Sequence, residues 1–217
     1  LATEDLIKVK IQNFYGIEIN DFAVSVARTA MWIAENQMLE QTKDTVYYNK
    51  DFLPLDRNDS IYEGNALKMD WAEIIKPYEL DYIMGNPPFV GKKEQSIQQK
   101  EDLKNVFDGK SIGILDYVTG WYKKTADYIK NFSVHAAFVS TNSISQGEQV
   151  IRLWRLLEPY HLTINFANRT FVWDNEAKHK AHVHVVIIGF SSSNHGDKQI
   201  FNIDNKIESA QNINPYL

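Results

Sequence analysis

Four consecutive residues, Asn86-Pro87-Pro88-Phe89, carry the groups of this sequence that are best suited to chemistry. They come just after an apolar stretch, 80–84, that we predict to be a strand. The carboxyl end of a strand is where open α/β sheets bind their ligands. Asn86 and Pro87 each precede a proline, which favours an extended backbone, and both prolines have a fixed φ and no N–H. The segment is therefore stiff and presents two acceptors, the Asn86 side-chain oxygen and the Pro87 carbonyl oxygen.

Two such acceptors suit the methylation of a planar, weakly nucleophilic amino group, such as the one on adenine. The lone pair of that nitrogen is delocalised into the ring, and acceptors that grip both N–H bonds would help to release it. Phe89 could stack on the ring, a contact worth about 1–3 kcal/mol per base. That contact would offset part of the cost of flipping a base out of a duplex. The alternative is a proline-rich turn with Phe89 in the hydrophobic core.

Two further strand ends carry polar groups that suit a nucleoside cofactor. Glu18 lies near the end of a predicted strand over 14–19, where an acidic residue can hold both hydroxyls of a ribose, here that of S-adenosylmethionine. Asn65 and Ala66 follow a short predicted strand over 60–62; they could bond the cofactor's adenine through a side chain and a backbone N–H. Taken alone, Glu18 is also explained as an acid at a helix N-terminus and Asn65 as part of an ordinary turn. The spacing of the three strand ends favours one shared crevice.

Strands alternate with helices along the chain, which predicts an α/β fold. Besides the strands named above, the sequence predicts strands over 134–140, 162–167 and 182–190. Apolar residues at helical spacing and flanking breakers predict helices over 21–39, 71–75, 114–129 and 146–157. The Val/Ile-rich stretch 182–190 is typical of a central strand. The polar stretch 91–113 indicates a mobile surface loop with room for one helical turn.

The composition narrows the classes of function. The chain has 217 residues, no cysteine and a net charge of −5, so it predicts one sizeable domain and excludes a disulfide framework. Mild acidity argues against a generally basic nucleic-acid binder but leaves room for a local basic groove. No signal peptide or membrane-spanning apolar run is present, so we expect a cytoplasmic protein without a membrane partner. His179, His182 and His184 cluster without supporting carboxylates, and we expect no metal.

The order Gly-Ile-Glu-Ile-Asn, Gly-Asn-Ala-Leu and Gly-Asn-Pro-Pro-Phe resembles the class I adenine-N6 DNA methyltransferases. More narrowly, the chain resembles the methyltransferase region of the MmeI-like (type IIG/IIL) restriction–modification enzymes. Those enzymes combine nuclease, methylase and target recognition in one polypeptide. The further runs that match this family extend over nearly the whole chain, at 115–118, 120–122, 140–144, 146–150, 165–167, 171–173, 175–177, 183–190 and 212–217.

The resemblance implies a Rossmann-like sheet of seven strands, with the last strand inserted antiparallel between two others. It also implies methyl transfer from S-adenosylmethionine to N6 of an adenine flipped out of double-stranded DNA. Carried over residue by residue, it assigns the cofactor to Glu18, Ile19, Asn65, Ala66 and Asn86. It assigns the target base to Asn86, Pro87, Pro88 and Phe89. Phe171 falls where related enzymes place a second aromatic ring over the base, and Trp173 is a rival for that role.

The sequence departs from the family pattern in two places. Asn65 stands where the wider superfamily has aspartate, and the glycine-rich loop that cradles the methionine half of the cofactor has no counterpart here. We therefore expect the first strand and this loop to lie upstream of Leu1. Residues 1–190 would form a partial methyltransferase domain, and 191–217 a linker toward a target-recognition domain outside the chain. Such a fragment is expected to bind the cofactor poorly and to methylate little or nothing.

Two other functions remain open. A methyltransferase that acts on a glutamine side-chain amide would suit the same tetrapeptide, although such enzymes usually carry Tyr where Phe89 stands and lack the downstream runs. The second alternative is a non-catalytic module that binds DNA or holds other domains together. The absence of the glycine-rich loop keeps this second alternative open, and an upstream loop in the gene would argue against it.

Overall fold

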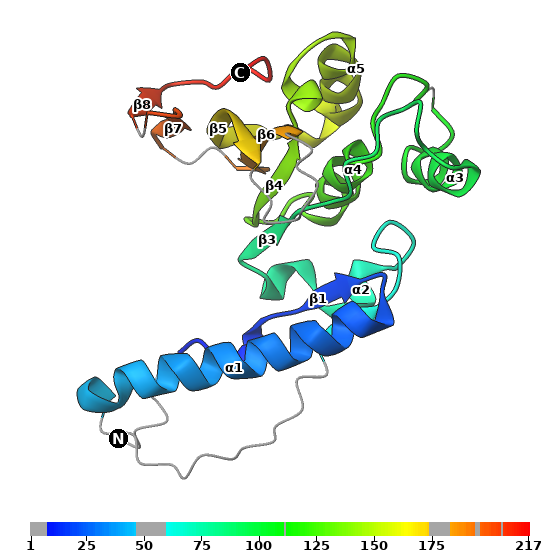
Figure 1. Cartoon of the computed structure of the whole chain (residues 1–217). Coiled ribbons are helices and arrows are strands. Elements are labelled where there is room, and N and C mark those ends of the chain that lie inside the picture. The colour runs from blue at the N-terminus through cyan, green and yellow to red at the C-terminus, as the bar shows by residue number, and fades with distance from the viewer. Residues whose placement is uncertain (1–7, 47–59, 111, 174–182, 194–195, 205) are drawn as a thin grey trace. The chain divides into compact units, whose positions relative to one another are not determined.

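The computed structural model in Figure 1 describes residues 8–46, 60–110, 112–173, 183–193, 196–204 and 206–217. The chain divides into two compact units, residues 1–75 and 76–217, and each is described by itself. Helices and strands alternate along the sequence, which confirms the predicted α/β class. Among these described residues, no helix has both the length and the apolar character needed to cross a membrane.

The first unit is built around two short parallel strands that pair in register, with Glu18 opposite Glu63. In chain order its elements are η2 (Ile11–Asn13), β1 (Gly16–Glu18), α1 (Asp21–Val46), β2 (Ile61–Glu63) and α2 (Trp71–Ile74). Both strands were predicted from the sequence within two residues of their ends. Because the strands are parallel, the residues that follow them leave the sheet at the same edge.

Helix α1 begins at a side-chain cap and packs on both strands. The Asn20 side chain accepts a hydrogen bond from Ala23 N–H at 3.0 Å, so Asn20 is the N-cap residue of this helix. Further along the helix, the Arg28 guanidinium donates to the carbonyl of Ile61 at 2.7 Å. Val24 is buried. The Arg28 bond ties α1 to the start of β2.

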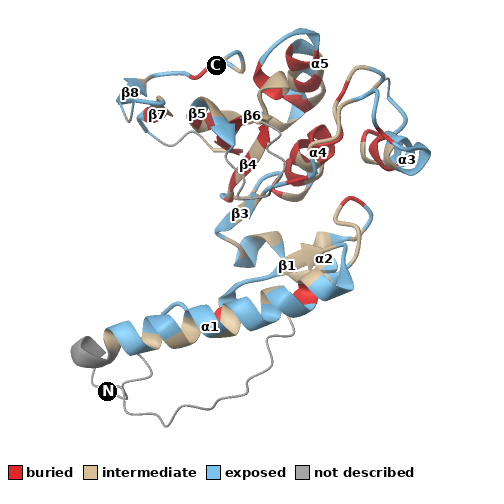
Figure 2. Cartoon of the chain, viewed as in Figure 1, coloured by how far each residue is buried: buried red, intermediate tan, exposed pale blue. Residues whose placement is uncertain are grey.

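The apolar stripe that predicted α1 is not the face that it buries. Phe22, Val26 and Ile33 are exposed, whereas Val24 is buried. Figure 2 accordingly shows most of α1 as exposed or intermediate, with little buried surface. Helical spacing therefore identified the helix correctly but did not identify its packed face, because that face is chosen by the position of β1 and β2.

The second unit contains a six-stranded sheet in the order β3-β4-β6-β5-β7-β8. Its strands are β3 (Tyr82–Gly85), β4 (His135–Thr141), β5 (Thr163–Trp173), β6 (Val183–Ser191), β7 (Lys198–Phe201) and β8 (Ile207–Ala210). Its helices are η3 (Pro77–Glu79), α3 (Ile97–Val106), α4 (Thr119–Tyr128), η4 (Asn142–Ser145), α5 (Glu148–Leu157) and η5 (Glu158–Tyr160).

Strand β6 runs antiparallel between β4 and β5. This confirms both the antiparallel insertion that the family resemblance implied and the central position of the Val/Ile-rich strand. Strands β3 and β4 are parallel. Since β4 and β5 are each antiparallel to β6, the strands β3, β4 and β5 all run in the same direction. Their carboxyl ends therefore meet at one edge of the sheet.

An aromatic cluster fixes helix α4 on this sheet. The Tyr122 ring stacks on Phe190 of β6 at a centroid distance of 5.3 Å and lies 5.4 Å from Phe138 of β4. All three side chains are buried. The Tyr122 hydroxyl shares a hydrogen bond of 3.0 Å with Ser140 Oγ, while burial raises the pKa of Tyr122 above its ordinary value of 10.0. The phenol is therefore a neutral core residue that ties α4 to β4 and β6.

The stretch 91–113, expected to be a loop with at most one helical turn, contains the ten-residue helix α3, so the expectation underestimated its helical content. Helix α3 begins with a capping box, in which Ser96 Oγ accepts from Gln99 N–H at 3.2 Å and Gln99 Oε1 accepts from Ser96 N–H at 2.9 Å. Leu103 and Phe107 of this region are fully buried. The capping-box spacing was present in the sequence, but the polar composition around it concealed the two apolar anchors.

The helix predicted over 114–129 begins five residues later, at Thr119. The preceding backbone is engaged elsewhere, because Tyr117 N–H donates to the carbonyl of Val90 at 2.9 Å and Asp116 N–H donates to Gln149 Oε1 at 3.1 Å. These bonds to residues distant in sequence replace the helical ones.

Residues after Ser191 also differ from the expected linker. Strand β7 pairs parallel with β5, and β8 pairs antiparallel with β7. Lys198 is buried, and its ammonium donates to the Gln211 carbonyl at 2.8 Å and to Asn212 Oδ1 at 2.9 Å. The segment extends the sheet of the second unit; that it leads toward a target-recognition domain stays a prediction.

Candidate functional site

The residues Asn86–Phe89, here called the NPPF loop, leave the sheet directly after β3. Gly85 pairs with Phe138 of β4, so the loop starts at the edge where β3 and β4 both end. The Asn86 and Pro88 side chains are exposed, Phe89 is half-buried and Pro87 is buried. Phe89 is thus not a core residue, as the proline-turn alternative would require.

The two acceptors singled out in the NPPF loop have no hydrogen-bond donor among the described residues. Asn86 Oδ1 and the Pro87 carbonyl oxygen receive no hydrogen bond from the part of the chain that the structure describes. The next carbonyl, of Pro88, accepts from Val90 N–H at 3.1 Å, which closes a tight turn around Phe89. The loop therefore holds two adjacent acceptors uncommitted while its own backbone is fixed.

The predicted cofactor residues of the first unit come together at one end of the β1–β2 pair. Glu18 is half-buried at the end of β1, and its carbonyl accepts from Gly64 N–H at 2.9 Å. That bond brings the turn containing Asn65 and Ala66 beside Glu18. The Glu18 carboxylate accepts one bond, from Asn20 N–H at 3.2 Å, and no other from the described residues. Ile19 is exposed.

The turn after β2 is held by bonds of its own. Asn65 Oδ1 accepts from Leu67 N–H at 2.9 Å, which is the Asx turn that the simpler reading of Gly-Asn predicted. The indole of Trp71 donates to the Ala66 carbonyl at 2.9 Å. These two bonds fix the backbone of the turn that carries Asn65 and Ala66.

Phe171 and Trp173 lie near the carboxyl end of β5, at the same sheet edge as the NPPF loop. Their ring centroids are 6.3 Å apart. Phe171 pairs with Val185 of β6, which pairs with Thr141 of β4, so the three residues form one row across the sheet. Three inter-strand spacings separate β5 from β3, about 14 Å in all. Phe171 therefore lies at the same edge of the sheet as the NPPF loop but is not adjacent to that loop.

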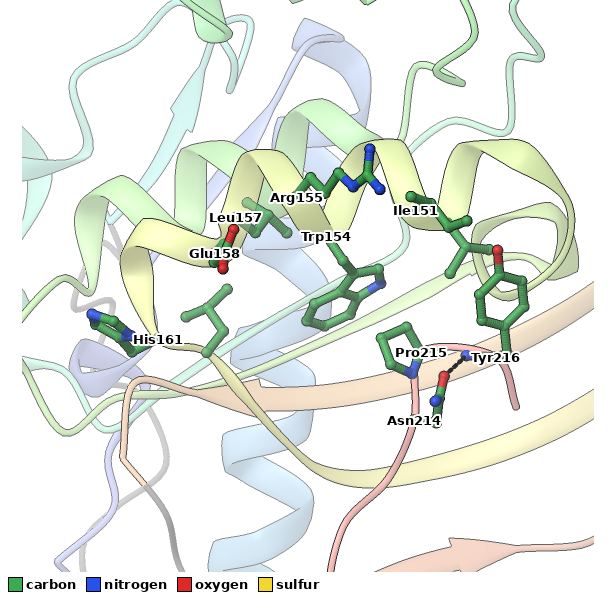
Figure 3. A pocket seen from close by; sticks show the side chains of 11 residues that line it. Ile151, Trp154, Arg155, Leu157, Glu158, His161, Asn214, Pro215 and Tyr216 are labelled. Atoms are coloured by element: carbon green, nitrogen blue, oxygen red, sulfur yellow. Dashed lines mark hydrogen bonds between the residues drawn. The ribbon is translucent and has the colours of Figure 1, made fainter.

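A separate pocket of about 600 Å³ lies between α5 and the C-terminal segment (Figure 3). Trp154 and Tyr216 line it, and the Tyr216 hydroxyl donates to the Gly147 carbonyl at 3.2 Å. None of the predicted site residues contributes to this pocket. Among the described residues, no three His, Cys, Asp or Glu side chains are grouped to hold a metal; His179 and His182 lie outside them.

Sequence reasoning missed a set of polar residues that hold the NPPF loop in place. Ser143 and Gln149 each donate to Asp116 Oδ2, and Asp116 Oδ1 accepts from Lys92 N–H at 3.0 Å. All three fall in runs that carried the family resemblance, which was the available signal. Their roles could not be read from the sequence, because their contacts join residues 24 to 33 positions apart.

Comparisons with known proteins agree with this architecture. The family model described as "MmeI, DNA-methyltransferase domain" matches residues 1–202. DNA methyltransferase A of Bacillus subtilis (strain 168) is 40% identical over 213 residues, which cover 96% of this chain and 24% of that protein. The type IIL restriction–modification enzyme MmeI, solved in complex with DNA, is 43% identical with a TM-score of 0.91, over 99% of this chain and 30% of that chain.

A more distant structure shares the fold alone. The type I restriction–modification methyltransferase subunit from Streptococcus thermophilus is 17% identical with a TM-score of 0.52, over 87% of this chain and 36% of that one. The chain thus spans well under half the length of each of these relatives. From the family match over residues 1–202 and the two relatives at 40% and 43% identity, the chain belongs to the MmeI DNA-methyltransferase domain family.

Proposed function

We propose that this chain is part of a restriction–modification enzyme that transfers a methyl group from S-adenosylmethionine to N6 of an adenine flipped out of double-stranded DNA. The observation that carries the proposal is the pair of uncommitted acceptors, Asn86 Oδ1 and the Pro87 carbonyl, at the carboxyl end of β3. Family membership supports the reaction class. The DNA in the MmeI complex supports double-stranded DNA as the partner.

In this proposal the residues at the ends of β1 and β2 hold the cofactor. Glu18 would accept from the ribose hydroxyls, because its half-buried carboxylate makes a single bond within the described protein. Ile19 would lie against the cofactor, and Asn65 and Ala66 would contact its adenine. S-adenosylmethionine, when bound, supplies a methyl group activated by a sulfonium sulfur.

The NPPF loop would act by position and by hydrogen bonding. Asn86 and Pro87 would accept from the two N–H bonds of the adenine amino group and so direct the nitrogen lone pair toward the methyl carbon. In the transfer, the bound cofactor would supply the methyl group and keep the electron pair of the broken C–S bond on sulfur, and the adenine nitrogen would lose one proton to water. Pro88 keeps the loop stiff, and Phe89 stacks on the base. We propose Phe171 for the second stacking ring, with Trp173 as its rival.

The variant Asn86→Ala in the full-length protein tests this proposal. We expect the methylation rate to fall at least 100-fold, because a lost hydrogen-bonding group in the transition state typically costs about that factor. Calorimetric binding of S-adenosylmethionine should stay within about twofold, since the cofactor is held mainly by the first unit. Mass spectrometry of digested DNA identifies the product, which should be N6-methyldeoxyadenosine.

The control is Asn105→Ala, which removes an exposed amide from α3 and should leave methylation unchanged. Retained methylation in Asn86→Ala, or a methylated cytosine as the product, would contradict the proposal.

A further inference from the structure

A three-residue segment, Leu115–Tyr117, joins the NPPF loop to the rest of the second unit. It lies between α3 and α4 in the sequence. Tyr117 N–H donates to the carbonyl of Val90 at 2.9 Å, and the Asp116 carboxylate accepts from Lys92 N–H at 3.0 Å. Val90 directly follows Phe89, so both bonds hold the downstream end of the NPPF loop. The upstream end is held by the pairing of β3 with β4.

The second carboxylate oxygen of Asp116 bonds to the neighbouring strand end. It accepts from Ser143 Oγ at 2.7 Å and from Gln149 Nε2 at 2.8 Å. Gln149 Oε1 in turn accepts from Asp116 N–H at 3.1 Å. The Gln149 side-chain amide therefore forms hydrogen bonds with both the backbone and the side chain of Asp116. Through Asp116 the loop that follows β3 is tied to the residues that follow β4 and to the first turn of α5.

The segment itself has a buried anchor on its other side. The Leu115 carbonyl accepts from Gln95 Nε2 at 2.9 Å, and the Tyr117 hydroxyl donates to Asp102 Oδ2 of α3 at 3.0 Å. Gln95, Asp102 and Tyr117 are all buried. The position of Asp116 is therefore fixed independently of the NPPF loop, which is what a residue needs if it is to set the position of another.

We propose that Asp116 is a positioning residue that fixes the two acceptors of the NPPF loop for methyl transfer; this inference rests on the proposed function above. Three of the roughly four acceptor positions of its carboxylate are already used by groups of the protein. Asp116 therefore holds the NPPF loop through these hydrogen bonds and does not accept a proton in the reaction; we call this residue the clamp. Displacing reacting groups by about 1 Å can cost a factor of about 100 in rate, so a loosened clamp affects turnover.

The test is a reciprocal pair of substitutions in the full-length protein. In Asp116→Asn, the new side-chain NH₂ must face either Lys92 N–H or the donors of Ser143 and Gln149, so at least one contact becomes donor against donor. In Gln149→Glu, two carboxylates face each other. Each single variant should lower kcat about 10- to 100-fold. The binding constant for S-adenosylmethionine should change less than about threefold, because neither substitution alters the residues proposed to hold the cofactor at the ends of β1 and β2.

The combination of Asp116→Asn with Gln149→Glu restores complementary donors and acceptors between the two side chains. We expect kcat of the double variant to be at least about tenfold higher than kcat of the single variants. The position of the base gives an independent readout. The fluorescence of 2-aminopurine at the target position increases when this base is flipped out and unstacked. Its signal with each single variant should differ from that of the wild type and should return toward it in the double variant.

Asp127→Asn is the matched control. It weakens the 2.6 Å ion pair with the buried Lys123 on α4 without touching the clamp. Its thermal midpoint should fall while kcat and the 2-aminopurine signal stay within about twofold of the wild type. If Asp116→Asn unfolds the protein, Gln149→Glu and the double variant still test the clamp.

Two results would overturn the proposal. One is a kcat within twofold of the wild type in the folded single variants; the other is a loss that the double variant does not recover. Failure of the proposed function shows differently, because Asn86→Ala would then still methylate. An inactive Asn86→Ala beside a fully active Asp116→Asn rejects the clamp alone.

Discussion

At the scale of single residues, the candidate site consists of a few groups that the fold leaves uncommitted. Asn86 Oδ1 and the Pro87 carbonyl lack a donor from the described protein, and the Glu18 carboxylate accepts one backbone bond only. Asn65 Oδ1, by contrast, accepts from Leu67 N–H within its own turn. This difference between engaged and uncommitted acceptors separates groups that shape the site from those that can bind a ligand.

Glu18→Ala provides a test at this scale. A hydrogen bond to a charged group contributes about 1.5–3 kcal/mol, so the dissociation constant of S-adenosylmethionine should rise about 10- to 100-fold in the full-length protein. Glu63→Ala is a matched control, because Glu63 is the exposed register partner of Glu18 on β2. Isothermal titration measures both variants. Equal binding by Glu18→Ala and the wild type would remove Glu18 from the cofactor site.

At the scale of elements, strand β6 organises the second unit. It pairs with β4 on one side and β5 on the other, so it sets which strand ends share an edge. Gly189 of β6 pairs with Phe166 of β5. The Phe166 ring lies over the glycine and occupies the space that a Cβ atom would need. The glycine is thus required by the close approach of this ring.

Gly189→Ala should therefore destabilise the sheet. The added methyl group must displace Phe166, and overpacking of this kind costs about 1–3 kcal/mol. Urea unfolding followed by circular dichroism should show a lower midpoint. Gly113→Ala is the control, because a Cβ there meets nothing within 4 Å. A smaller side chain in the double variant Gly189→Ala with Phe166→Leu should recover part of the loss. An unchanged midpoint in Gly189→Ala would show that the Phe166 ring can move aside without a loss of stability.

At the scale of the whole molecule, the 217 residues make up a part of the proteins they resemble. They correspond to 24% of the Bacillus subtilis relative and 30% of MmeI. No glycine-rich cofactor loop occurs in the sequence. The residues proposed to hold S-adenosylmethionine would therefore contact its ribose and adenine, and none of them is proposed for the methionine half.

Residues 1–217 alone should bind S-adenosylmethionine more weakly than the full-length protein, with a dissociation constant well above the low-micromolar range. Methylation by this chain alone should be negligible for the same reason. Isothermal titration of both proteins at the same salt concentration provides the comparison, and circular dichroism provides the control for folding. Low-micromolar binding by residues 1–217 would show that Glu18, Asn65 and Ala66 suffice for the cofactor.

The sequence alone determined those features that depend on neighbouring residues. Two consecutive prolines fix the backbone of the NPPF loop whatever surrounds it, and Asn20 can cap α1 because its partner Ala23 is three residues away. Alternating strands and helices, and a Val/Ile-rich central strand, likewise follow from local pattern. The family resemblance supplied the antiparallel insertion of β6, which local pattern does not contain.

Only the tertiary structure decided the features that depend on contacts between distant residues. The bonds from Tyr117 to Val90 and from Asp116 to Gln149 end the predicted helix early and create the clamp. Pairing with β5 turns a polar stretch into strand β7, and two buried apolar anchors make α3 a helix. Each of these outcomes replaces a local preference with a contact between segments far apart in the chain. The physical reason is that such contacts satisfy backbone groups or bury apolar side chains that no local pattern can satisfy or bury.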